Sequence, residues 1–203
     1  MIEPSRNIQI SPMQVSHARD VARLHIEGIH TGFVSSLGEN FVTSLYEAIA
    51  ESPSSFGNVA VMNNRVVGFI SFTDSLGRLY KSVVKKGGLR FFFLLAGKLF
   101  SFAKIKKILE TLFYPNRIKK LDLPDAELLS IVVDSSARGK GIASRLVQAG
   151  LAECRSRSLP AVKVLVASEN QKANALYQKC GFNLKSEIKN HGVKSNIYVL
   201  NTK

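Results

Sequence analysis

A glycine-containing loop is the stretch of this sequence whose residue types best suit chemistry. It spans Asp134–Ser144 and joins an apolar, β-type run at 128–133 to a helical run at 144–152. Gly139 and Gly141 let the backbone turn at little steric cost, so successive amide N–H groups can converge on one spot. That spot is the start of the expected helix, where unpaired N–H groups and the helix dipole favour a bound phosphate. Taken alone, the loop indicates only an anion site, because an ordinary strand–turn–helix connection has the same pattern.

A second segment, at 161–182, narrows the interpretation of the glycine loop. After a β-type run at 161–166 comes Asn170, followed by Leu176-Tyr177 and then Gly181-Phe182. With the R/Q-x-x-G-x-G/A pattern at 138–143, this order resembles the two cofactor motifs of the GNAT superfamily of acetyl-CoA-dependent N-acetyltransferases. A Walker P-loop does not fit, because its Gly-Lys-Ser/Thr is missing, and a Rossmann fingerprint lacks its third glycine.

The resemblance implies an α/β (α+β) GNAT fold in a single domain, 1–203. Its centre is a mixed, mostly antiparallel twisted sheet of about six to seven strands flanked by helices. The hydrophobic pattern predicts strands at 7–11, 59–62, 66–73, 128–133, 162–167, 182–189 and 195–201, and helices at 16–28, 37–51, 144–152 and 172–179. The turn-prone pair Asn63-Asn64 joins the second and third strands. A basic, Phe-rich helical insertion at 75–123 separates the third strand from the fourth.

The same resemblance assigns the acetyl-CoA contacts, with no metal. The backbone of the fourth strand would pair with the pantetheine arm like an added strand, through Ile131, Val132 and Val133. The loop amides would hold the pyrophosphate, from Arg138, Gly139, Lys140, Gly141, Ile142, Ala143 and Ser144. Asn170 matches the position that contacts the cofactor arm. Tyr177 matches the position whose hydroxyl lies near the thioester sulfur, where it can protonate the leaving thiolate.

The general base is expected at the start of the fourth strand. Glu127 lies there, on the same strand parity as Leu129, Ile131 and Val133. The neighbouring Asp125 replaces it if the strand begins earlier, and some family members use water chains with no dedicated base.

The acceptor amine is expected near the end of the first helix. Glu27, His30 and Phe33 surround a loop that in the family borders the acceptor cleft. A carboxylate such as Glu27 could bind an ammonium group, although a helix-surface charge has the same appearance in a sequence.

The net charge of +13 is concentrated in the insertion. Twelve basic residues and one acidic residue lie between Leu76 and Lys120, together with six of the twelve Phe. Three interpretations compete: a helical lid beside the cleft, a basic amphipathic surface at 78–120 that touches an anionic membrane or a partner protein, and attraction of an anionic substrate. Nucleic acid is not expected as a partner, because no recognition motif accompanies the charge.

The composition is that of an ordinary globular protein, with 45% hydrophobic residues over 203 positions. No apolar run approaches the ~20 residues of a membrane span, and Met1–Arg6 does not resemble a signal peptide. We therefore expect a cytoplasmic protein, with peripheral contact at the inner membrane face as the alternative and a homodimer left open. Cys154 and Cys180 are expected to be reduced thiols, and the four His form no metal-ligand cluster.

These features predict an N-acetyltransferase that acts on a small-molecule primary amine. An amino sugar or a nucleotide-linked amino sugar is the first choice, since a basic insertion beside the cleft would suit an anionic acceptor. The alternatives are acetylation of a protein N-terminus or lysine, and a non-catalytic acyl-CoA-binding or membrane-associated protein.

Overall fold

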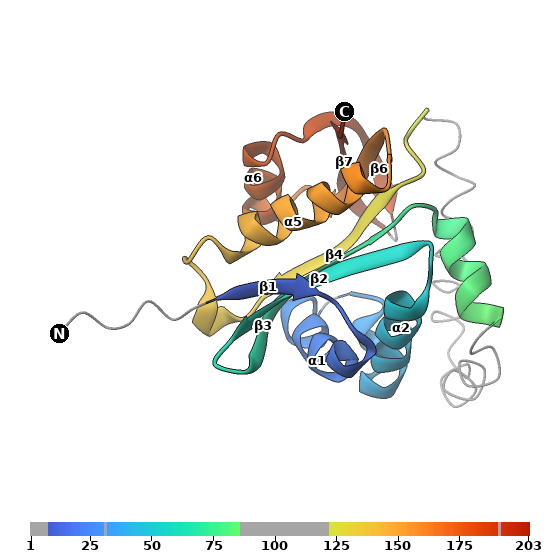
Figure 1. Ribbon diagram of the computed structural model, residues 1–203. Helices are drawn as coiled ribbons and strands as arrows, with labels where there is room; N and C mark the ends of the chain where they lie inside the picture. The colour runs from blue at the N-terminus through green and yellow to red at the C-terminus, as the bar shows by residue number, and fades with distance from the viewer. Residues whose placement is uncertain (1–7, 31, 86–121, 191) are drawn as a thin grey trace.

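A seven-stranded sheet forms the centre of the computed structural model, which describes residues 8–30, 32–85, 122–190 and 192–203 (Figure 1). The strands are β1 (Gln9–Pro12), β2 (Ser55–Met62), β3 (Arg65–Thr73), β4 (Glu127–Val133), β5 (Ala161–Ala167), β6 (Asn183–Asn190) and β7 (Val193–Asn201). They lie in the order β1-β2-β3-β4-β5-β7-β6, and all neighbours are antiparallel except the parallel pair β4 and β5. The mixed, mostly antiparallel sheet predicted from the sequence is confirmed.

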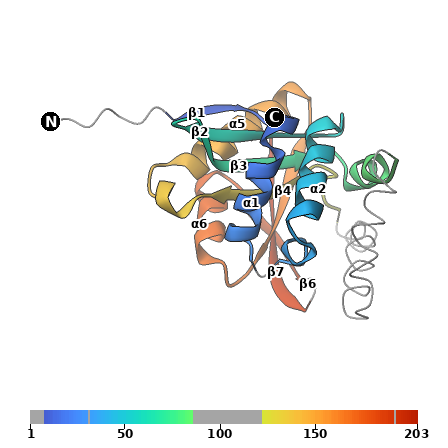
Figure 2. The same ribbon diagram turned by 90° about the horizontal axis from the view of Figure 1, so that it is seen from below.

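Helices cover the two faces of this sheet. They are α1 (Ala18–Gly28), α2 (Glu39–Glu51), α5 (Ile142–Ser156) and α6 (Gln171–Lys179), with short 3-10 turns at Val15–His17, Ser35–Leu37 and Ser135–Ala137. Figures 1 and 2 show α1 and α2 on one face and α5 and α6 on the other. The buried side chains form one cluster beneath α5 and α6, which includes Phe72 and Leu146, and another beneath α1 and α2, which includes Phe69 and Tyr46.

The β2–β3 hairpin forms where the sequence predicts it. Asn63 and Asn64 have φ of +52° and +60°, the left-handed values that a tight two-residue hairpin turn requires. The second helix begins at Glu39 rather than at residue 37, because Ser35–Leu37 is a 3-10 turn that ends at Gly38 with φ of +87°.

Strand β4 contains a bulge that was not predicted from the sequence. Ser71 of β3 pairs with Ser130, but the next residue, Phe72, pairs with Leu128. Leu129 is therefore an extra residue in β4, and such an insertion bends the strand and reverses the alternation of its side chains.

The bulge overturns the expected parity of Glu127. Leu128 and Ile131 both contact the cluster beneath α5, as does Val133. Glu127, adjacent to Leu128, therefore projects to the opposite face and does not share a face with Ile131 or Val133.

Strands β4 and β5 separate shortly after they meet. Their parallel pairing consists of Glu127 with Lys163 and Leu128 with Val164. From Ser130 onward β4 continues beside β3, while β5 pairs with β7 over its whole length. We call the resulting gap between 130–133 of β4 and 165–167 of β5 the fork.

The insertion lies between β3 and β4, as expected. Residues 76–85 are helical, whereas 86–121, with most of the basic and Phe-rich residues, lie outside the described residues. Leu76 and Tyr80 of the described helix pack with Leu129 of β4 and Leu165 of β5. The insertion thus begins against the sheet face that Glu127 shares.

Gly150 allows α5 to approach β3 closely. A Cβ added there would lie 2.1 Å from Cε2 of Phe72, whose ring stacks on Phe56 at 5.1 Å between centroids. Gly150→Ala should therefore destabilise the protein by roughly 1–3 kcal/mol through overpacking, although alanine favours helix. Gly77→Ala in the helix at 76–85 is the matched control, because the nearest atom to its added Cβ is 3.8 Å away. Urea denaturation tests both, and a Gly150→Ala variant as stable as the wild type would contradict this packing.

Candidate functional site

The cofactor residues expected on β4 lie along one side of the fork. Ile131, Val132 and Val133 all follow the last residue that pairs with β5. Gly28, at the end of α1, packs directly on Val132, since a Cβ at Gly28 would lie 2.4 Å from Cγ1 of Val132. The end of α1 therefore lies against the β4 side of the fork.

Hydrogen bonds shape the loop that leaves β4. The Asp134 carboxylate accepts from the backbone N–H of Ser136 at 2.8 Å and from its hydroxyl at 2.7 Å, and these bonds lower the pKa of Asp134. Farther along, Nε of Arg138 donates to the carbonyl oxygen of Val133 at 3.2 Å. These bonds fix the segment from Asp134 to Arg138, which precedes the two glycines.

The glycines leave the loop backbone open. Gly139 and Gly141 have φ of +80° and +72°, and a Cβ on either would have no atom within 4 Å. Arg138 and Lys140 are exposed, while Ile142 is buried and anchors the first turn of the 15-residue helix α5. Positive φ disfavours a side chain at either glycine, and the space that a Cβ would enter is free. The loop N–H groups can therefore donate hydrogen bonds to a bound anion.

Tyr177 is buried on α6, with 4% of its surface exposed. Its ring lies 5.7 Å from that of Phe182 and 6.4 Å from that of Tyr198. Burial raises the pKa of Tyr177, and the nearby Cys180 raises it further. The Ser144 hydroxyl hydrogen-bonds to Cys180, so the end of α6 lies against the first turn of α5. Tyr177 keeps its proton at neutral pH, close to the glycine loop.

Asn170 caps helix α6. Its side-chain oxygen accepts from the N–H of Ala173 at 3.2 Å, and the residue is exposed. This use of the oxygen explains the position of Asn170 by helix capping alone.

Glu127 is buried at the closed end of the fork. It is 7% exposed, and its Oε2 lies 3.5 Å from Nζ of Lys163, which is 3% exposed. Burial raises the pKa of Glu127 to about 7, against the opposing effect of the Lys163 charge. Oε2 accepts no hydrogen bond within the described part of the chain, so it has lone pairs free to take a proton. The alternative base, Asp125, is exposed.

Tyr80 lies near this carboxylate. Burial raises the pKa of Tyr80 to about 12, and the charge of Glu127 contributes to the shift. The described part of the insertion therefore reaches Glu127.

The three expected acceptor residues lie at and after the end of α1. Glu27 and His30 are exposed, and Phe33 is half-buried. Within the described residues, no hydrogen bond or ion pair joins Glu27 or His30 to Glu127 or Tyr177. The packing of Gly28 on Val132 nevertheless sets this segment beside the fork.

A family comparison identifies the chain. The model of the acetyltransferase (GNAT) family matches residues 26–182, which includes the glycine loop, the fork and α6. The chain belongs to the GNAT acetyltransferase family.

Solved structures share the fold of this GNAT chain. An N-acetyltransferase from Staphylococcus aureus Mu50 is 21% identical, with a TM-score of 0.63, 97% of this chain and 99% of that chain covered. The ribosomal-protein-S18-alanine N-acetyltransferase of Escherichia coli is 13% identical, with a TM-score of 0.61 and coverages of 97% and 95%. Arabidopsis thaliana NAA60 in complex with acetyl-CoA is 15% identical, with a TM-score of 0.63 and coverages of 96% and 98%. A comparison with curated proteins finds no significant match.

The sequence analysis assigned no role to three buried polar groups of this GNAT domain. Lys163 is a single charged residue in an apolar strand. Asn174 donates to the carbonyls of Ala167 and Asn170 and accepts from Asn196 and Tyr198, which ties α6 to β5 and β7. His25 contacts the Tyr46 hydroxyl through Nδ1 at 2.7 Å, and burial lowers the pKa of His25 to about 4. The signal for each was a polar residue on an apolar face.

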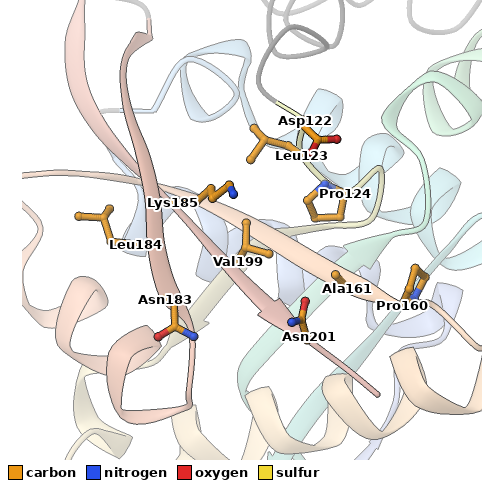
Figure 3. A pocket seen from close by; sticks show the side chains of 10 residues that line it. All are labelled: Asp122, Leu123, Pro124, Pro160, Ala161, Asn183, Leu184, Lys185, Val199 and Asn201. Atoms are coloured by element: carbon orange, nitrogen blue, oxygen red, sulfur yellow. The ribbon is translucent and has the colours of Figure 1, made fainter.

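A cavity of about 510 Å³ lies at the other end of the sheet from the glycine loop (Figure 3). It is bordered by residues that precede β4 and begin β5 and β6, and by the end of β7: Asp122, Leu123, Pro124, Pro160, Ala161, Asn183, Leu184, Lys185, Val199 and Asn201. Figure 3 shows that Leu123 and Pro124 form one wall. Lys163 donates to the carbonyl of Pro124, one of the residues that border this cavity.

Among the described residues, no cluster of His, Cys, Asp and Glu could hold a metal ion. Nor does that part of the chain contain a helix long and apolar enough to cross a membrane. Cys154 and Cys180 are free thiols, as expected.

The raised pKa of Glu127 predicts a specific dependence of stability on pH. Between pH 4.5, its ordinary pKa, and pH 7, the folded state binds more protons than the unfolded state. Stability therefore falls as the pH rises through this range. Relative to Glu127→Gln, which does not titrate, the wild type should lose up to about 3 kcal/mol between these pH values.

Urea denaturation at several pH values measures this difference. Glu187→Gln is the control, because Glu187 is exposed and pairs with Lys194 at 3.9 Å in solvent. A difference between the wild type and Glu127→Gln that does not change with pH would contradict the burial of an ionisable Glu127.

Proposed function

We propose that this protein transfers the acetyl group of acetyl-CoA to a primary amine. The observation that carries the proposal is the fork, which has unpaired strand edges and opens toward a glycine loop at the start of α5. An extended pantetheine arm can add to the β4 edge at Ile131–Val133 as a strand would. Its pyrophosphate then reaches the N–H groups of 138–144. Asn170, which is exposed at the start of α6, would contact the arm.

Glu127 and Tyr177 divide the proton transfers. Acetyl transfer requires a neutral amine, and it requires a proton for the departing thiolate. Glu127, with a pKa of about 7, takes the amine proton, because a base is most effective when its pKa is near the working pH. Tyr177, held protonated by burial, donates to the thiolate.

The two groups approach the fork from opposite faces of the sheet. Tyr177 belongs to the cluster beneath α5 and α6, whereas Glu127 projects to the face that carries α1 and α2. In the fork, an amine that enters from the Glu127 face could meet a thioester that lies near Tyr177 on the other face. Glu27, His30 and Phe33 at the end of α1 would then border the amine, on the Glu127 face.

The proposed acceptor is a small molecule, with an amino sugar or a nucleotide-linked amino sugar as the first choice. The helix at 76–85 packs its Leu76 and Tyr80 onto the sheet face beside Glu127. This packing leaves less room for a large acceptor, such as a protein, to reach Glu127 from that face. Acetylation of a protein N-terminus is the second candidate, because one protein that shares this fold is the ribosomal-protein-S18-alanine N-acetyltransferase of Escherichia coli. A basic surface at 78–120 that contacts an anionic membrane or a partner stays a proposal, as do a homodimer and a cytoplasmic location.

Release of thiol from acetyl-CoA across a panel of amines tests the function. The panel contains nucleotide-linked amino sugars, aminoglycosides, polyamines, amino acids and short peptides. One strongly preferred class of small amine supports the proposal. Preference for peptides would select the second candidate, and binding of acetyl-CoA without turnover on any amine would favour a non-catalytic role.

Replacing the Tyr177 hydroxyl should slow the reaction. Tyr177→Phe removes the proton donor and keeps the ring contacts with Phe182 and Tyr198, so we expect kcat to fall roughly 10- to 1,000-fold. The affinity for acetyl-CoA should change little. Steady-state kinetics and calorimetry measure the two quantities, and an unchanged kcat would refute the assigned role.

Placing a carboxylate in the loop should strongly weaken cofactor binding. Gly141→Asp sets a negative charge against the pyrophosphate, and such like-charge contacts cost several kcal/mol, so the affinity for acetyl-CoA should fall about 100-fold or more. Gly192→Asp is the matched control: Gly192 also has a positive φ, +83°, and open space at its Cβ, but it lies in the turn between β6 and β7. Calorimetry that finds equal affinity for the two variants would count against the loop.

A further inference from the structure

Lys163 is a buried cation held by two backbone carbonyls and one carboxylate. It lies in the otherwise apolar β5 and is 3% exposed. Its ammonium group donates to the carbonyl oxygen of Pro124, donates to that of Asp125 at 3.1 Å, and faces Oε2 of Glu127 at 3.5 Å. An ammonium group has three N–H donors; two of them bond to the carbonyl oxygens, and the positive charge faces the Glu127 carboxylate as an ion pair.

Stability alone explains this arrangement poorly. Removing an ammonium and a carboxylate from water costs several kcal/mol each, and well-packed apolar side chains at such positions are often as stable or more so. Glu127 and Lys163 lie directly opposite each other in the parallel register, one residue before the last pair that joins β4 and β5, Leu128 and Val164. Their side chains therefore meet where the fork begins.

We propose that Lys163 is a positioning residue, which holds the Glu127 carboxylate at the closed end of the fork and favours its ionised form. This inference rests on the proposed role of Glu127 as the base. Through the two carbonyls, Lys163 also fixes the chain that returns from the insertion, so the site of the base and the end of the insertion share one anchor.

The other groups around Glu127 cannot replace this charge. From the helix at 76–85, Tyr80 has a pKa raised to about 12 and is neutral at working pH. From β3, the partner of Glu127 is Thr73, whose hydroxyl donates to the carbonyl of Ser54. Asp125 adds a negative charge close to Lys163. Lys163 is thus the cation that pairs with Glu127 within the described residues.

Three substitutions separate charge from hydrogen bonding. Lys163→Arg keeps the charge and the donors, Lys163→Gln keeps donors without charge, and Lys163→Met removes both. The pH dependence of kcat/KM is measured for each with one acceptor, so that the ionisation of the acceptor contributes equally throughout.

The ascending limb of the profile should move to higher pH by about one unit in the Gln and Met variants, and much less in the Arg variant. A shift of one pH unit lowers kcat/KM about tenfold at pH values below the pKa of the base, and leaves kcat/KM unchanged at pH values well above that pKa. Lys185→Met, which removes an exposed charge at the border of the cavity, should leave the profile unchanged.

A decrease by the same factor at every pH would overturn the proposal, because Lys163 would then only support the fold. An unchanged profile in the Gln and Met variants would overturn it as well. If Lys163→Met fails to fold, the comparison of Gln with Arg decides. Failure of the proposed function gives a different result: Glu127→Gln would retain full kcat, whatever the Lys163 variants do.

Discussion

The short pairing of β4 with β5 is the constraint on which the site depends. Two residue pairs join these strands, and beyond Leu128 each continues with its other neighbour. An open sheet interior is costly unless its backbone groups find partners, so the gap is a place where a ligand with its own amides can bind as a strand. The bulge at Leu129 bends β4 at the point of separation, and the bond from Arg138 to the Val133 carbonyl fixes the far end. The glycine loop then follows directly from β4.

Burial acts in the same direction on the two groups that would transfer protons, yet gives them different tasks. It disfavours the charged form of each and raises both pKa values. The carboxyl of Glu127 starts from a low value and arrives near neutrality, where Lys163 opposes a further rise. The phenol of Tyr177 starts high and stays protonated. Burial thus gives a base on one face of the sheet and an acid on the other, on either side of the fork.

Much of this could be predicted from the sequence, because it depends on local rules. The glycines at 139 and 141 were interpretable from their spacing, and the Asn63-Asn64 turn from its chemistry. The bulge was not predictable, since one extra residue in an apolar strand leaves no mark on composition, and the inferred parity of Glu127 failed for this reason. Lys163 was missed because its partners, two carbonyls and a carboxylate at 124–127, lie more than 30 residues away in the sequence. The cap formed by Asn170 follows the ordinary capping rules, and the same residue also fits the cofactor motif, so the sequence alone does not separate the two roles.

Amide hydrogen exchange on addition of acetyl-CoA tests the central claim most directly. If the cofactor binds in the fork as an added strand, exchange should slow at amides in 130–133 and 138–144, which gain hydrogen-bond partners. The short edge strand β1 should be unaffected. Binding that leaves these amides unchanged, or that protects only the region around the cavity at the opposite end of the sheet, would contradict the account.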